Sequence, residues 1–361
     1  MIDVIIADDS AFLRQILKEV LEREGKIRVI GQAKNGKEAV ELVKALRPHV
    51  LILDCEMPVM NGLEALNKIM AERPLPVFMF SSLTPESARI TVKALESGAV
   101  DFFVKPTRLF DLASVEKALV RKIETIVIKG AAGPRLRTDW DKGFPARTLV
   151  PKRPLPENIP TREIDLIAMG SSTGGVQATS LLIPQLSASC PPIVWVQHMP
   201  EHFTKSFSER LAVVSKMKVL EAEDGDILQR GNVYLGRGGT QMRVAKAGGQ
   251  MRIQLAGTER VSGFCPSCDV LFESVSYHYG ENALGVILTG MGNDGLNGLR
   301  LMHEKKSYVI GQDEATCVVY GMPRAAFEAG VVDLQVSVED IPSVIEKVCG
   351  ISQKNGSGVL G

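Results

Sequence analysis

Short apolar runs alternate with amphipathic segments along most of this chain, and no other feature limits its possible folds as strongly. In the first third the runs favour strands, and the segments between them place apolar residues at helical spacing. The expected strands are Asp3–Ala7, Arg28–Ala33, Val50–Asp54, Val77–Ser81 and Asp101–Lys105, and the expected helices include Ala11–Glu24 and Gly36–Leu46. Strand alternating with helix predicts βαβ units and a parallel sheet covered on both faces.

The alternation stops within "KGAAGPRLRTDWDKGFPARTLVPKRPLPENIPTR" and then resumes. This segment is rich in proline, glycine and charge, which is typical of a linker. We therefore predict a first domain at 1–128, a linker at 129–162, a second α/β domain at 163–350 and a flexible tail at 351–361. Strands are expected at 164–169, 192–197, 232–235 and 284–289, with a β-hairpin around Gly248-Gly249 within 242–255.

Composition excludes several classes of protein. The 361 residues hold 42 Lys and Arg against 42 Asp and Glu, a formal net charge of zero, whereas general nucleic-acid binders are basic. No secretory signal and no apolar run near the ~20 residues that span a bilayer is visible, so no membrane insertion is expected. Six scattered cysteines indicate reduced thiols and a cytoplasmic protein. Cys265 and Cys268 form the one close pair; without a second ligand pair for zinc, they are interpreted as small buried hydrophobic residues beside a turn.

Acidic residues end two of the strands expected in the first domain. Asp8 and Asp9 follow the first strand and Asp54 ends the third, while Ser81 and Lys105-Pro106 end two others. The carboxyl ends of parallel strands form one edge of the sheet, where ligands bind. Clustered carboxylates suit Mg²⁺, and a metal beside a carboxylate suits phosphoryl transfer onto it. The alternative for each acid alone is a helix cap or a solvated strand end.

"IIADDS", "LILDCEMPVMNG", "FMFSSLT" and "GAVDFFVKP" together resemble the receiver domains of response regulators. The resemblance implies a flavodoxin-like, doubly wound parallel sheet, with Asp54 as the phosphate acceptor. It also implies that Asp8, Asp9 and Asp54 hold Mg²⁺, and that Ser81 and Lys105 follow the phosphate. Phe102 stands where this family keeps its switching aromatic residue.

The turn "MGSSTGG" lies between an expected strand and an expected helix of the second domain. It lacks the lysine of a P-loop and the second glycine of a dinucleotide fingerprint. Gly170, Ser172 and Gly174 do fit G-x-S-x-G, which exposes a nucleophilic serine near a helix N-terminus. A bare turn with a capping serine is equally compatible with this stretch alone.

A serine nucleophile needs a base and a group that orients the base. Among five histidines, position favours His198, which directly follows an expected strand in "VWVQHMP". Asp294 is the only acid of "LGVILTGMGNDG", a second glycine-rich strand end. The triad then comes in the order Ser, His, Asp, which differs from that of the α/β-hydrolases.

"GSSTGGVQA", "QHMPEHFTKSFSERL", "CPSCDVLFESV", "LTGMGNDG" and "VVYGMPRAA" resemble the catalytic domain of the chemotaxis protein-glutamate methylesterases. The resemblance implies a mainly parallel, Rossmann-like sheet and a triad of Ser172, His198 and Asp294. It places oxyanion donors at Thr173 and Met291, with Gly174 in support. Gln241 stands where the family often has histidine, and Cys265 and Cys268 are less usual. These departures are expected at the rim, affecting substrate preference more than chemistry.

The resemblance also implies substrates and regulation. Glutamyl methyl esters on the cytoplasmic domains of chemoreceptors would be hydrolysed with release of methanol, and receptor glutamines could be deamidated, with no cofactor for the esterase step. A chemotaxis histidine kinase would phosphorylate Asp54, and the unphosphorylated receiver would cover the triad. The alternatives are a receiver-bearing adaptor without enzymatic activity and, less in keeping with the composition, a DNA-binding output domain.

Overall fold

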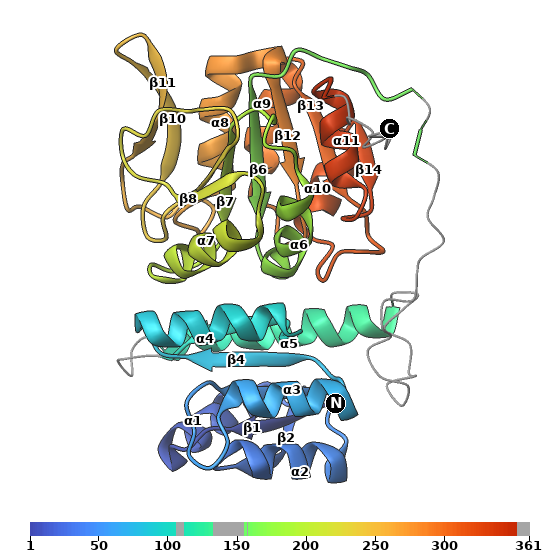
Figure 1. Cartoon of the computed structure of the whole chain (residues 1–361). Helices are drawn as coiled ribbons and strands as arrows, with labels where there is room; N and C mark the ends of the chain where they lie inside the picture. The colour runs from blue at the N-terminus through green and yellow to red at the C-terminus, as the bar shows by residue number, and fades with distance from the viewer. Residues whose placement is uncertain (106–111, 133–154, 157, 352–361) are drawn as a thin grey trace, which may run out of the picture.

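The computed structural model describes residues 1–105, 112–132, 155–156 and 158–351, which form two α/β domains (Figure 1). In the first domain five parallel strands run in the order β2-β1-β3-β4-β5, the flavodoxin-like order, which confirms the expected fold. Its elements are β1 (Ile2–Ala7), α1 (Ala11–Glu22), β2 (Ile27–Ala33), α2 (Gly36–Leu46), β3 (Val50–Asp54), α3 (Gly62–Glu72), β4 (Val77–Ser81), α4 (Pro85–Glu96), β5 (Asp101–Val104) and α5 (Leu112–Ala132).

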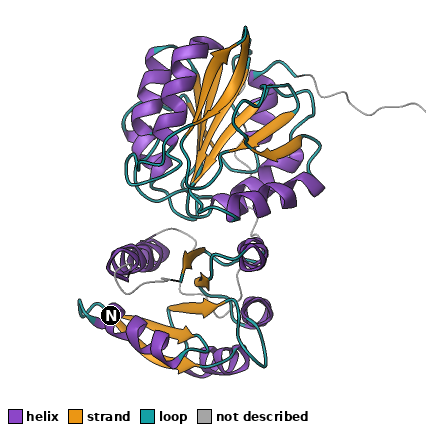
Figure 2. Ribbon diagram, turned by 90° about the vertical axis from the view of Figure 1, so that its left-hand side faces the viewer, coloured by secondary structure: helices purple, strands orange, loops and turns teal. Residues whose placement is uncertain are grey.

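The second domain is built on a seven-stranded parallel sheet, ordered β14-β13-β12-β6-β7-β9-β8, with helices on both faces (Figure 2). The expected hairpin is confirmed as a separate antiparallel pair. The strands are β6 (Leu166–Ser171), β7 (Ile193–Gln197), β8 (Lys218–Glu221), β9 (Asn232–Leu235), β10 (Met242–Ala247), β11 (Gln250–Leu255), β12 (Ala283–Ile287), β13 (Tyr308–Gln312) and β14 (Leu334–Val336). The helices are α6 (Gly175–Leu182), α7 (Phe203–Val214), α8 (Cys268–Tyr279), α9 (Leu296–Glu304), α10 (Met322–Glu328) and α11 (Ile341–Val348), with short 3₁₀ turns at Ile183–Gln185 and Gly280–Asn282.

The central strands are buried along their whole length, which explains their unbroken apolar sequences. All residues of β3, β4, β6, β7, β12 and β13 are buried. A parallel sheet covered on both faces requires this pattern. Polar side chains are therefore placed where the strands end, at one edge of each sheet.

Helices α4, α6 and α7 bring the two domains together (Figure 1). Apolar packing continues across the boundary, since Val319 of the second domain lies in one buried cluster with Leu119 and Ile123 of α5. The first domain thus covers the edge of the second sheet on which β6 and β7 end.

The boundaries of the expected linker need correction at both ends. Helix α5 continues to Ala132, four residues beyond the expected domain end at 128. At the other end Leu155 and Ile159 pack against the core, and the Arg162 N–H donates to the Val348 carbonyl oxygen (2.7 Å). The interior of the expected linker, 133–154 and 157, and the expected tail from 352 lie outside the described residues.

None of the helices in the described ranges is both long and apolar enough to cross a bilayer.

Candidate active site

Ser172 lies directly after β6 on the turn that leads into α6. Its backbone N–H donates to the Thr289 carbonyl oxygen (3.0 Å). Gly174 is the N-cap residue of α6 and has φ +82°, and this helix has no side-chain cap. A Cβ on Gly174 would lie 2.5 Å from Val318, so glycine is required here both by space and by backbone conformation. The capping-serine alternative is therefore wrong, and the Ser172 hydroxyl is left for other use.

His198 follows β7, and three contacts fix its position. Its backbone N–H donates to the Ser171 carbonyl oxygen (3.1 Å), and its ring stacks on Phe264 with ring centroids 3.7 Å apart. Nε2 lies 2.7 Å from Asp294 Oδ2. Nδ1 is buried and has no hydrogen-bond partner among the described residues. Nε2 is therefore hydrogen-bonded to the carboxylate, and Nδ1 is the ring nitrogen that can accept a proton.

Asp294 is surrounded by hydrogen-bond donors. Besides His198, its carboxylate accepts from Ser267 Oγ (2.6 Å), from the Cys268 N–H (2.7 Å) and from the Asp269 N–H (3.3 Å). Burial by itself would raise the pKa of Asp294, but the hydrogen bonds from His198, Ser267 and Cys268 outweigh it and lower the pKa below 3.8. The group is therefore ionised at neutral pH and can orient an imidazole.

Gln241 and Cys268 do not lie on a substrate rim, and that expectation is wrong. Gln241 is buried, its amide donates to the carbonyl oxygens of Glu259 (2.8 Å) and Phe264 (3.1 Å), and its Oε1 accepts from the Ser267 N–H (2.9 Å). Cys268 is buried at the start of α8, and its Sγ lies 3.7 Å from His198 Nε2. Both residues therefore support the histidine and the aspartate from beneath. Cys265 is only partly buried, so its interpretation as a small buried residue is wrong.

The turn after β12 lies against the serine. A Cβ on Gly290 would come within 2.9 Å of Ser172 Cβ, so Met291 begins next to Ser172. Thr173 is buried, and its hydroxyl donates to Asp101 of the first domain (2.5 Å). The expected oxyanion donors, Thr173 and Met291, thus flank Ser172, and Gly174 shapes the turn between them and the helix.

Residues of the first domain cover this turn. Asp101, at the start of β5, accepts from Thr173 and also pairs with Lys122 (2.6 Å). Gln177 donates to the Ala99 carbonyl oxygen. The sequence analysis did not predict a role for Asp101, because a single acidic residue at the start of a strand gives no signal until its partner in the other domain is known.

Two further contacts join α4 and β5 to α7. Phe102 stacks on Phe203 with ring centroids 4.5 Å apart, and Arg210 pairs with Glu96 (3.0 Å). The expected switching aromatic residue therefore lies within the contact between the domains. A change in the position of Phe102 would alter its contact with α7, the helix that follows the loop of His198.

The acidic residues of the first domain meet as expected at the carboxyl edge of its sheet. Lys105 Nζ lies 2.6 Å from Asp54 Oδ2 and 3.0 Å from Asp8 Oδ2. Asp8 and Asp54 are buried whereas Asp9 is exposed, and one oxygen of each of the three carboxylates lies within 4.8 Å of the others. Burial raises the pKa of Asp54 to about 6, Lys105 opposes the rise, and Asp8 adds to it. Pro106 lies outside the described residues.

Ser81 is buried behind this pocket, and its hydroxyl is held by α4. Its Oγ accepts from Thr91 Oγ1 (2.8 Å), which also lies 3.4 Å from Cys55 Sγ. Of the expected switch residues, Lys105 therefore contacts Asp54 in this state, whereas Ser81 is hydrogen-bonded to Thr91.

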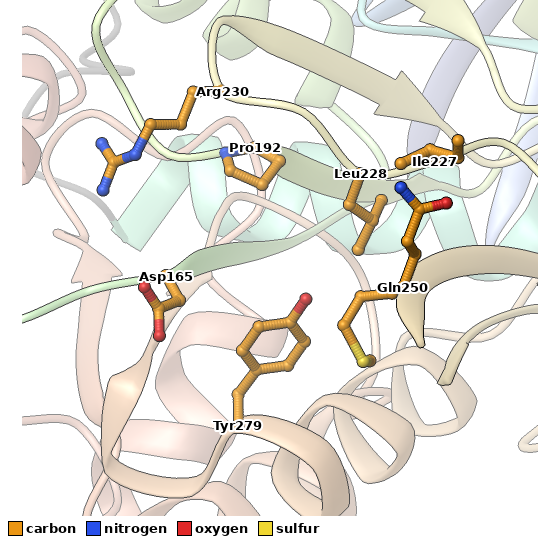
Figure 3. Close-up of a pocket in the computed structure, with 8 residues that line it drawn as sticks. Asp165, Pro192, Ile227, Leu228, Arg230, Gln250 and Tyr279 are labelled. Atoms are coloured by element: carbon orange, nitrogen blue, oxygen red, sulfur yellow. The ribbon is translucent and has the colours of Figure 1, made fainter. Parts of the chain in front are cut away.

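A separate pocket of about 420 Å³ lies at the opposite edge of the second sheet (Figure 3). Asp165 and Pro192, which precede β6 and β7, line it together with Arg230 and Tyr279. Because the serine follows the other end of β6, this pocket takes no part in the triad.

The comparisons with known proteins match both halves of the chain. Residues 167–345 match the family model of the CheB methylesterases, and residues 4–116 match that of the response regulator receiver domain. A protein-glutamate methylesterase/protein-glutamine glutaminase 1 of Caulobacter vibrioides is 44% identical over 94% of this chain and 96% of its own length. A protein of the same name, without the number, from Methanococcus maripaludis is 39% identical over 96% of this chain and 97% of its own.

A solved structure, the CheB methylesterase catalytic domain of Thermotoga maritima, is also similar. It is 35% identical, covers 51% of this chain and 99% of that one, and superposes with a TM-score of 0.50. The second domain described above therefore has a counterpart of known architecture.

Proposed function

Because this chain belongs to the protein-glutamate methylesterase family and carries a response regulator receiver domain, we propose that it demethylates chemoreceptors under the control of phosphorylation. Its substrates are glutamyl methyl esters on the cytoplasmic domains of the receptors, and its site of action is the cytoplasm. The observation that carries the proposal is the pairing of His198 with a fully hydrogen-bonded Asp294 beside the Ser172 turn.

The proposed acyl transfer uses three side chains. Nδ1 of His198 takes the proton of the Ser172 hydroxyl, and the serine oxygen attacks the ester carbonyl. Backbone N–H groups of Thr173 and Met291, next to the N-terminus of α6, stabilise the negative oxygen. His198 then returns the proton to the leaving methanol, and water hydrolyses the acyl-enzyme by the same route. A glutamine side chain follows the same path with ammonia as the leaving group, which accounts for deamidation. The esterase step needs no cofactor.

The acidic pocket fits Mg²⁺. Its three carboxylates offer hard oxygen ligands close to one another, and the two buried ones have Lys105 as counter-charge. When bound, Mg²⁺ neutralises negative charge on the oxygens of a transferring phosphoryl group. Asp54 attacks the phosphorus of a phosphohistidine on a chemotaxis histidine kinase, and the histidine nitrogen leaves.

Phosphorylation is proposed to uncover the triad through the switch residues. The new dianion on Asp54 draws Lys105 away from Asp8, and it draws the Ser81 hydroxyl away from Thr91. Space vacated beside β4 lets Phe102 turn inward, which breaks its stacking on Phe203. The contacts of β5 and α4 with α6 and α7 then weaken, and the receptor segment reaches Ser172.

The test is methanol release from methylated receptor fragments, with and without a small phosphoryl donor. Ser172→Ala is expected to abolish release, and Asp54→Asn to keep the basal rate while losing activation by the donor. If the intact protein releases no methanol in either state, the esterase proposal is wrong, and the second domain acts as an adaptor or on another acyl substrate.

A further inference from the structure

Cys268 adds a soft ligand to the pair formed by His198 and Asp294. Its Sγ lies 3.7 Å from His198 Nε2, and Nε2 lies 2.7 Å from Asp294 Oδ2. One ligand atom from each residue lies within 4.8 Å of the others, and both the thiol and the carboxylate are buried. The proposed hydrolysis uses no part of the Cys268 side chain.

An imidazole nitrogen, a thiolate and a carboxylate oxygen form a common zinc ligand set, and three protein ligands leave a fourth position open. At ordinary Zn–N and Zn–S bond lengths, tetrahedral geometry separates nitrogen from sulfur by about 3.6 Å and nitrogen from oxygen by about 3.3 Å. The first separation is nearly present already. The second requires the hydrogen bond between His198 and Asp294 to open by about half an ångström.

We propose that His198, Cys268 and Asp294 form a binding site for Zn²⁺ and similar thiol-seeking divalent ions, and that the bound ion inhibits the hydrolase reversibly. The two anionic ligands neutralise the dication, so the filled site carries no net charge into its buried surroundings. His198 and Asp294, which folding brings beside Cys268, thus supply the further metal ligands that no second ligand pair in the sequence motif provides.

Metal binding moves two protons in the site. The Cys268 thiol gives its proton to solvent, and the proton on His198 Nε2 is replaced by the metal, so the ring carries its proton on Nδ1 instead. Nδ1 is the buried nitrogen, without a hydrogen-bond partner in the described part of the chain, that would otherwise accept the Ser172 proton. Binding therefore removes the base and separates it from Asp294 at the same time.

Cys265 supplies a matched control, because it lies three residues away in the same motif, is partly exposed and belongs to no such cluster among the residues that the structure describes. The full-length protein is titrated with Co²⁺ while thiolate-to-metal charge-transfer absorption is recorded. Wild type and Cys265→Ser are expected to bind one ion with this absorption, and Cys268→Val to lose it. Absorption that persists in Cys268→Val, or that disappears in Cys265→Ser, overturns the proposal.

X-ray absorption spectroscopy of the zinc-loaded wild type tests the site without any substitution, so its result does not depend on whether a variant folds correctly. One sulfur at about 2.3 Å together with nitrogen and oxygen ligands at about 2.0–2.1 Å is expected. No sulfur, or two sulfurs, contradicts the site. These measurements do not require the enzyme to be active on any substrate.

The inhibition itself rests on the proposed function and is tested separately. Each variant is assayed for methanol release against its own zinc-free rate. Losing the sulfur ligand in Cys268→Val is expected to raise the zinc concentration for half-inhibition at least about tenfold, while Asp54→Asn, in the other candidate metal pocket, leaves it unchanged. Equal sensitivity of wild type and Cys268→Val refutes inhibition at this site. A protein that binds cobalt as described but releases no methanol refutes the esterase proposal alone.

Discussion

Asp54, which ends β3, and Asp294, which lies in the loop between β12 and α9, are both buried carboxylates, yet their surroundings shift their pKa values in opposite directions. Each is a buried carboxylate at the carboxyl edge of its sheet. Asp54 shares Lys105 with Asp8, and its pKa is raised to about 6. Asp294 accepts four hydrogen bonds, and its pKa is lowered despite burial.

The difference follows from how completely each charge is compensated. Burial disfavours ionisation at both positions, and only sufficient donors reverse its effect. An undercompensated carboxylate gains from a cation and can form a bond to phosphorus, whereas a fully compensated one remains ionised and holds its partner in place. The proposed function thus assigns the same residue type a switch role in one domain and a fixed orienting role in the other.

Asp294→Asn gives the largest expected effect. The amide preserves shape but cannot stabilise the imidazolium, so kcat of the phosphorylated enzyme should fall about 10⁴-fold. Steady-state methanol release measures it. Asp269→Asn is the matched control, since Asp269 lies in the first turn of α8, next to the donor Cys268, but its carboxylate accepts from Ser262 and the Gly298 N–H instead of from His198. An equal loss in both variants would show that local structure, not orientation of the base, is being measured.

Asp101→Ala should release the cover over Ser172. It removes the hydrogen bond with Thr173, and bonds to charged groups contribute about 1.5–3 kcal/mol, so the basal rate is expected to rise at least about tenfold. The rate without phosphoryl donor is compared with that of Glu96→Gln, which removes a partly exposed ion pair of the same interface. The control should change the rate by less than about fivefold. A basal rate unaltered by Asp101→Ala would contradict inhibition through this contact.

Ser267→Ala tests whether the donors around Asp294 set its pKa. Losing the hydroxyl raises that pKa, so the titration of the Asp294 carboxyl followed by ¹³C NMR should move to higher pH, and kcat/KM should fall about fivefold. Ser262→Ala, which removes a donor to Asp269 instead, should leave the Asp294 titration in place. A fall in rate with an unmoved titration would assign Ser267 a purely structural role.

The strand ends that carry Ser172, His198, Asp294 and Asp54 could be predicted from sequence, because apolar runs mark strands and parallel sheets collect their carboxyl ends at one edge. The strands β8, β13 and β14 were missed. For β8 and β14 the reason is that four and three residues with little burial give a weak signal. The expected limits of the first domain and linker were wrong because α5 runs on past 128 and Arg162 is hydrogen-bonded to Val348.

The supporting residues were beyond sequence reasoning. Gln241, Phe264 and Ser267 act through contacts between loops that are distant along the chain, and no spacing encodes them. Cys268 was interpreted as a small buried hydrophobic residue, and its burial is confirmed. Its position against His198 and Asp294 became visible only when folding brought α8 beneath β7 and β12.

Asp54→Asn is expected to stabilise the first domain slightly, the smallest of these effects. The raised pKa means that the folded state binds the Asp54 proton more tightly than the unfolded state, whose value is near 3.8. The contribution of Asp54 to stability is therefore complete below about pH 3.8 and is lost as the pH rises through 6. An asparagine does not ionise, so it causes no loss of stability as the pH rises, although Lys105 loses its nearer partner. Without divalent metal at pH 7.5, a gain of about 1 kcal/mol is expected, a rise of a few degrees in the unfolding temperature by calorimetry.

The gain from Asp54→Asn should shrink at pH 5, where the wild-type carboxyl is largely protonated. Asp9→Asn, an exposed acid of the same pocket, should change stability by less than about 0.5 kcal/mol at either pH. A stabilisation by Asp54→Asn that is the same at both pH values would mean that the gain comes from packing and not from charge. Asp54 would then no longer be the undercompensated carboxylate that distinguishes the first domain's pocket from the triad.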